Sequence, residues 1–250
     1  MTQRLPVMIL VFSAVVTPAG LGAQEIDTVR VGSRALQGVQ LKPGSIVMGS
    51  FTRNHGVETP TSTTTQHVTS GSRGTEKVYL IETVHASGDD DTTRSVIVVR
   101  TSDLSLMHHR VKAAHDSAAV TATSHYLTGW VVLPDEPVSV LDQQLDHPVF
   151  PIEGQVPWLF PLLPLAEGYA ATIPHYSEWA GGEQWSTIRV LSSEMVRSGT
   201  ESFECWKIDG GELFPGYRVT YWVDKRTRKI VQGVARGSGA GPEYWSRARP

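Results

Sequence analysis

The sequence has a single cysteine, no excess of basic residues and, beyond residue 23, no apolar run of membrane-spanning length. Because Cys205 has no second cysteine to pair with, an internal disulfide is excluded and a packed core must hold the fold together. The 22 Lys and Arg residues against 25 Asp and Glu residues give a net charge of −3. Nucleic-acid binding requires a basic face, so we expect no nucleic-acid partner.

Recognisable catalytic motifs are also missing from the sequence. There is no Gly-x-Ser-x-Gly elbow for a serine nucleophile, and the glycines of residues 237–241 lack the Lys-Ser/Thr of a phosphate-binding loop. The acidic run from Asp89 to Asp91 lacks the alternating oxygen ligands and the downstream Glu of a calcium loop. We therefore expect a non-catalytic protein that holds no cofactor.

The N-terminus has the layout of a secretory signal peptide. Arg4 precedes an apolar run from Leu5 to Val16, and the segment closes on the small residues Gly22 and Ala23. We predict that residues 1–23 are removed and that the mature chain, periplasmic or secreted, begins at Gln24. This chain would have no membrane span after the signal is removed.

The rest of the sequence alternates apolar and polar residues with a period of two, which is typical of half-buried strands. Turn residues join these strands into hairpins, over residues 76–102, 104–133, 183–208 and 216–235. Sequential hairpins give an antiparallel sheet, and about ten strands must curl to bury their apolar face. The sequence thus predicts a mainly β fold built on one strongly curved antiparallel sheet.

The predicted domain organisation is simple. Residues 24–236 form a single antiparallel β domain, because there is no internal repeat and no second core. Residues 237–250 form a flexible C-terminal tail that Tyr244 and Trp245 could anchor. Within the domain, residues 55–75 are rich in Thr, Ser and Gly, and they could form either an exposed edge strand or a loop.

One apolar insert interrupts the strands. Residues 146–165 contain five prolines, and the part from Glu153 to Leu163 is the best candidate for a short helix, with Pro157 in its first turn. The insert lies before the last strands, so we expect it to plug the interior of the curled sheet.

Three segments of the C-terminal half carry a family resemblance: "LPLAEG" (163–168), "EMVRSGTESFECWKI" (194–208) and "YWVDKRTRKIV" (221–231). Their order and spacing are similar to those of uncharacterised exported bacterial proteins that resemble the lipoprotein carriers LolA and LolB. The resemblance implies a half-barrel sheet wrapped around the proline-rich insert. In the carriers the concave side holds acyl chains, but this sequence has no long amphipathic helices to line such a cavity.

The resemblance implies a lipid or another apolar small molecule as ligand, and an envelope protein is a further expected partner. Aromatic residues gather in the C-terminal half, where they either fill the core or line an apolar cavity. The candidate cavity residues are Trp158, Leu162, Phe203, Trp206, Tyr221 and Trp222.

Cys205 lies between Phe203 and Trp206 on a predicted strand. A reactive thiol needs a basic neighbour and partial exposure, and Lys207 is two positions away. An unpaired cysteine is more often a small buried apolar residue, so we predict that Cys205 is buried and inert.

The alternative function is a metal-dependent protein or enzyme that uses the histidine-rich segment 108–125. A hairpin turning near Asp116 would set His109 opposite Thr123, with His125 as a diagonal neighbour. Two histidines and a nearby carboxylate can hold zinc or copper, so His109 and His125 are weak candidate ligands.

Overall fold

A computed structural model describes residues 26–36, 40–88, 91–151, 153–214, 216–237 and 242–249. The predicted signal peptide, residues 1–23, lies outside the described residues. No helix in the described part of the chain is both long and apolar enough to cross a membrane.

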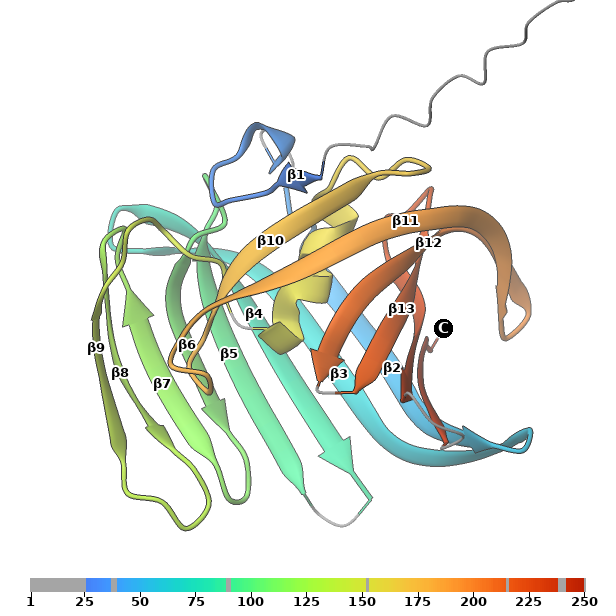
Figure 1. Ribbon diagram of the computed structural model, residues 1–250, viewed down its shortest axis with the longest axis horizontal. Helices are drawn as coiled ribbons and strands as arrows, with labels where there is room; N and C mark the ends of the chain where they lie inside the picture. Colours follow the sequence, from blue (N-terminus) through green and yellow to red (C-terminus); the bar gives the residue numbers. More distant parts are fainter. Residues whose placement is uncertain are drawn as a thin grey trace, which may run out of the picture.

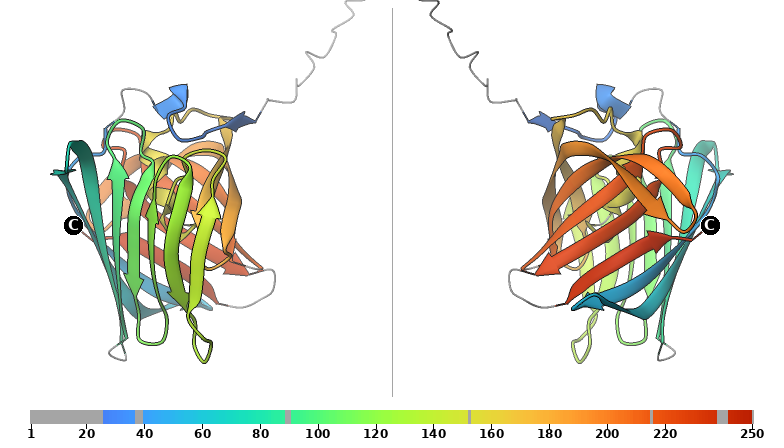
Figure 2. Two further views of the ribbon diagram at one scale, coloured as in Figure 1. Left: turned by 90° about the vertical axis from the view of Figure 1, so that its left-hand side faces the viewer. Right: turned by 90° about the vertical axis from the view of Figure 1, so that its right-hand side faces the viewer.

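The described residues fold into one large curved sheet of 15 strands, shown in Figures 1 and 2. The strands are β1 (Asp27–Thr28), β2 (Gly44–Asn54), β3 (Val57–Arg73), β4 (Glu76–Ser87), β5 (Thr92–Arg100), β6 (Leu106–Lys112), β7 (Ser117–Ala122), β8 (Tyr126–Val132), β9 (Ser139–Gln144), β10 (Ala170–Ser177), β11 (Gly182–Ser198), β12 (Glu201–Phe214), β13 (Tyr217–Asp224), β14 (Ile230–Gly237) and β15 (Glu243–Ala248). Two 3-10 helices accompany them, η1 (Arg34–Leu36) and η2 (Glu153–Leu162).

The sheet is curved but does not close on itself. Its strand order is β1-β10-β11-β12-β13-β14-β15-β2-β3-β4-β5-β6-β7-β8-β9, so β1 and β9 are the two edges. The pairs are antiparallel except for the short parallel pair of β1 and β10. The predicted fold class, a mainly β protein with a strongly curved antiparallel sheet, is confirmed.

The proline-rich insert forms η2, which lies inside the curve, between β10–β11 and β4 in the view of Figure 1. Pro157 and Pro161 lack the N–H groups that a regular α-helix would use, and the segment takes the tighter 3-10 form instead. Leu159, Phe160 and Leu163 are almost fully buried against the concave face of the sheet. The insert therefore supplies much of the main core.

The Thr-rich segment 55–75 is ordered as part of an internal strand. β3 pairs with β2 on one side and with β4 on the other. Threonine is β-branched and suits a strand whose neighbours satisfy its backbone groups. Pro60, which cannot donate to a ladder, pairs with Phe51 next to a bulge in the register, where the missing N–H is tolerated.

The predicted hairpins are present, with one correction. β4 and β5 form the hairpin expected over 76–102. The segment 104–133 forms three strands rather than two, because it turns twice, at Ala113–Asp116 and again at Thr123–Tyr126. The extra turn changes the register, and His109 pairs with Val120 instead of Thr123.

The prediction of a flexible tail is wrong for residues 243–248. These residues form β15, which pairs with β14 on one side and with β2 on the other. The ring of Trp245 stacks between Phe51 at 6.2 Å and Trp222 at 6.1 Å. β15 thereby joins the C-terminal strands to the N-terminal strands in one sheet.

Candidate functional site

The concave side of the sheet holds a cavity of about 500 Å³. Its walls come from the segment before β2, from β2, β3 and η2, and from the β13–β14 turn. The volume lies within the range of about 300–1,000 Å³ that is usual for small-molecule sites. The side chains of Ile46, Met48, Val68, Ile81 and Leu162 give the cavity an apolar wall.

Tyr221 forms another part of this wall, and two neighbouring glycines make room for it. A Cβ atom on Gly210 of β12 would lie 2.8 Å from the Tyr221 ring, and one on Gly233 of β14 would lie 3.2 Å from it. The ring also packs edge-on against Phe160 of η2, with the centroids 5.2 Å apart. Burial raises the pKa of the Tyr221 hydroxyl, so this group stays neutral and can donate a hydrogen bond.

Three of the six predicted cavity residues line this cavity: Trp158, Leu162 and Tyr221. Trp206 packs against the main core beside the cavity, under the guanidinium of Arg228. Whether a ligand binds these residues stays a prediction.

Phe203 and Trp222 are not part of the same interior, which corrects the prediction for them. They pack with Cys205 in a second cluster on the opposite face of the sheet. Successive side chains of a strand point to opposite faces, so Tyr221 and Trp222 cannot line the same cavity.

The charged side chains that line the cavity are basic. They belong to Lys42, Arg228 and Lys229, and no Asp or Glu occurs among the described residues that line the cavity. Neutral polar side chains, among them Thr64 and Gln66, complete the polar part of the lining.

Arg228 is held in place by its turn and by two contacts of its side chain. Its backbone N–H donates to the carbonyl of Asp224 at 2.9 Å, and its φ is +61°. Its guanidinium donates to the carbonyl of Leu163 at 2.7 Å and lies 4.8 Å from the ring centre of Trp206. Burial lowers the pKa of this guanidinium, but arginine still stays charged at physiological pH.

Sequence reasoning missed a buried polar cluster formed by Ser95 of β5, His109 of β6 and Glu178 of the β10–β11 turn. The Ser95 hydroxyl lies 3.0 Å from His109 Nε2, and His109 Nδ1 lies 2.7 Å from a carboxylate oxygen of Glu178. All three residues are buried, and none of them lines the 500 Å³ cavity. The cluster therefore ties the β10–β11 turn to β5 and β6 across the curve of the sheet.

The two candidate metal ligands do not come together. His109 is 2% exposed and faces Glu178, whereas His125 is exposed in the turn between β7 and β8. The predicted pair is wrong because the segment contains two turns where one was expected. The part of the alternative function that required His109 and His125 to bind one metal ion is therefore not supported.

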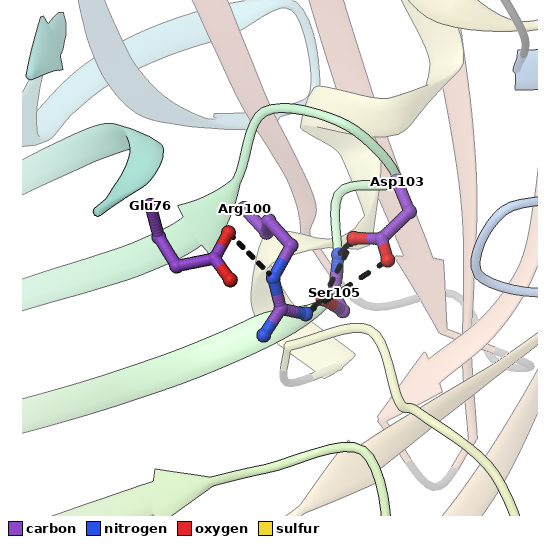
Figure 3. Close-up of polar contacts among 4 residues, drawn as sticks. All are labelled: Glu76, Arg100, Asp103 and Ser105. Atoms are coloured by element: carbon purple, nitrogen blue, oxygen red, sulfur yellow. Dashed lines mark hydrogen bonds and ion pairs between the residues drawn. The ribbon is translucent and has the colours of Figure 1, made fainter. Parts of the chain in front are cut away.

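A second polar cluster fixes the connection between β5 and β6 and is drawn in Figure 3. Arg100 donates to Glu76 at 3.3 Å and to Ser105 at 2.5 Å, and it lies 3.8 Å from Asp103. Asp103 in turn accepts from the backbone and the hydroxyl of Ser105. Since the guanidinium is shared among three residues of the protein, we interpret the cluster as structural.

Cys205 is fully buried, as predicted. Burial raises its pKa to about 12, and the neighbouring carboxylates of Asp224 and Glu194 act in the same direction. The thiolate is the nucleophilic form of cysteine, so this thiol is unreactive at neutral pH.

Comparisons with known proteins identify the family and leave its activity open. A family model described as a protein of unknown function, DUF3108, matches residues 51–236, which is more than half of the chain. A search of curated proteins finds no match. Among solved structures, a beta-barrel-like protein of the domain of unknown function DUF1849 from Brucella abortus is similar at 13% identity, with a TM-score of 0.49. The similarity covers 84% of this chain and 97% of that one.

Proposed function

We propose that this chain, which belongs to the DUF3108 family, is an exported, non-catalytic protein that binds a lipid or another apolar ligand in the cavity of its curved sheet. The observation that carries the proposal is the cavity itself, about 500 Å³ in volume with an apolar wall formed by η2 and β2–β4. The resemblance of the C-terminal segments to relatives of LolA and LolB supports the same class of ligand. The signal-like N-terminus supports a place in the cell envelope.

Energetics favour such a ligand because the cavity wall is largely hydrocarbon. Each Å² of apolar surface that leaves water contributes roughly 25 cal/mol, so even part of an alkyl chain would bind measurably. The η2 insert fills the centre of the core and leaves this space open beside it. The main core and the cavity thus share Leu162 and Trp158 as a common wall.

Titration with N-phenyl-1-naphthylamine, an uncharged apolar dye, tests the proposal. We expect saturable binding by the wild type and at least about tenfold weaker binding by Leu162→Arg, because a charge in the apolar wall opposes transfer of the dye from water. Leu191→Arg is the matched control, since Leu191 is 50% exposed and does not line the cavity.

Leu162 also belongs to the core, so a second variant is needed in case Leu162→Arg does not fold. Ile46→Arg serves this purpose, because Ile46 lines the cavity from β2 and is only half-buried. The far-ultraviolet circular dichroism spectrum checks the fold of each variant. Equal dye binding by wild type, Ile46→Arg and Leu191→Arg would show that the cavity is not the site.

A further inference from the structure

We propose that the cavity selects amphiphiles that carry an anionic head group on a single alkyl chain, such as an alkyl carboxylate or an alkyl phosphate. This inference rests on the proposed function and names the chemical class of its ligand. It follows from the charge of the lining, from the backbone of Arg228 and from the presence of both basic and apolar side chains in the lining.

The charges around the cavity are of one sign. Lys42, from the segment before β2, and Arg228 and Lys229, from the β13–β14 turn, line the same space, and none of the described lining residues is acidic. Among the ion pairs of the described residues, none involves these three cations. The carboxylate of Asp224, in the same turn, accepts instead from the backbone and hydroxyl of Thr227. The cavity lining therefore carries positive charge that forms no ion pair with any described residue.

Arg228 occupies a backbone conformation that ordinarily favours glycine. A non-glycine residue at a φ of +61° is uncommon and costs conformational free energy, and such residues concentrate at functional positions. Here the conformation brings the guanidinium to the cavity, where the Leu163 carbonyl and the Trp206 ring hold it. A guanidinium has five N–H donors, so the single bond to Leu163 leaves donors for a ligand.

The remaining lining fits the other end of an amphiphile. Ile46, Met48 and Val68 offer an apolar wall to an alkyl chain, while Gln66 adds a neutral polar side chain to the lining. The volume of about 500 Å³ lies in the lower half of the usual range of ligand sites, which suits one chain better than two. Hydrogen bonds between cationic donors and an anion are about twice as strong as neutral ones, so the head group should add affinity.

Competition against the bound dye tests the head group with probes that share one alkyl chain: dodecanoate, dodecyl phosphate, dodecanol and dodecyltrimethylammonium. We expect at least one of the two anions to bind about tenfold more tightly than dodecanol, and the cation to bind most weakly. The two anions distinguish a carboxylate from a phosphate head group. A diacyl phosphatidic acid tests the limit to one chain and is expected to compete poorly.

Arg228→Gln tests the residue that carries the inference. We expect this variant to bind the preferred anion about tenfold more weakly and to bind dodecanol as the wild type does. Arg226→Gln is the matched control, because it removes the same charge from the same turn at an exposed residue that does not line the cavity. Lys229→Gln repeats the test without the contact to Leu163, in case Arg228→Gln disturbs the turn.

The outcomes separate this inference from the proposed function. If dodecanol and both anions bind equally, or if Arg228→Gln, Lys229→Gln and Arg226→Gln behave alike, the inference fails while the apolar site stands. If the dye does not bind to the wild type at all, the proposed function fails as well. Preference for diacyl phosphatidic acid over both single-chain anions would overturn the limit to one chain.

Discussion

Neighbouring residues on one strand serve different parts of this molecule. Tyr221 lines the cavity on the concave face, and the next residue, Trp222, is buried in the cluster on the opposite face. Cys205 belongs to that second cluster, where Asp224 and Glu194 lie close enough to raise its pKa further. Burial and negative charge both disfavour the thiolate, so we assign Cys205 a packing role.

The predicted inertness of Cys205 is tested by thiol labelling. An exposed cysteine has a pKa of about 8.5 and reacts readily at pH 9. In the folded protein the pKa is about 12, so labelling by Ellman's reagent at pH 9 should be slow and should become fast in urea. Rapid stoichiometric labelling of the folded protein would contradict this assignment.

The raised pKa also predicts a pH dependence of stability. The unfolded thiol ionises near pH 8.5, as an exposed cysteine does, while the folded thiol stays protonated to about pH 12, so the unfolded state binds fewer protons between these values. The free energy of unfolding should therefore fall as the pH rises from about 9 to 12, and Cys205→Ala should lose this part of the slope. The comparison with Cys205→Ala separates the thiol from the buried tyrosines, whose pKa values are raised as well.

At the scale of the element, β15 decides how the two halves of the chain meet. It pairs with β14 and β2, and its Trp245 lies in a stack with Phe51 and Trp222. The guanidinium of Arg53 covers the Trp245 ring at 4.3 Å, which adds a cation–π contact. β14 and β2 each use one edge to pair with β15. Without β15, the backbone N–H and C=O groups along those two edges would have no strand partner.

The substitution Trp245→Ala tests this role of β15. Loss of the half-buried indole should lower the free energy of unfolding by about 2–4 kcal/mol, from lost apolar burial and lost stacking. Tyr244→Ala is the matched control on the same strand, since Tyr244 is 44% exposed, and should cost less than about 1 kcal/mol. Urea unfolding followed by circular dichroism measures both. A loss from Trp245→Ala no larger than that from Tyr244→Ala would show that β15 contributes little.

At the scale of the whole molecule, the curved, unclosed sheet that the described residues form gives the protein a concave interior that a flat sheet would lack. The η2 insert fills part of this interior, and the cavity occupies the space between η2, β2–β4 and the β13–β14 turn. A site for an apolar ligand suits a protein that works in the cell envelope, where lipids are abundant. Export is thus part of the proposed function.

The export proposal predicts the N-terminus of the mature protein. Residues 1–23 have a basic start, an apolar run and a small-residue end, which signal peptidases recognise and remove. N-terminal sequencing of protein recovered outside the cytoplasm should begin within a few residues of Gln24. Exported protein that still carries Met1 would contradict this prediction.

Much of the local structure could be predicted from sequence because its causes are local. Period-two alternation and turn residues predict β4 and β5, and the prolines of residues 146–165 predict a short helix rather than a long one. The burial of Cys205 between large apolar neighbours follows from the same pattern. Two predictions of local structure were wrong. We expected one turn in segment 104–133 and missed the second, near Tyr126, and we expected a flexible tail where residues 243–248 form a strand.

By itself, the sequence determined that this is a β protein with one apolar insert, because alternation and proline act through the chain's own nearest neighbours. Only the tertiary structure decided that Arg228 and Lys42 share a cavity and that Glu178 meets His109, because these residues are distant in the chain. It also decided which aromatic side chains face the cavity. The register of each strand fixes which face its side chains point to, and that register depends on pairing with strands elsewhere in the sheet.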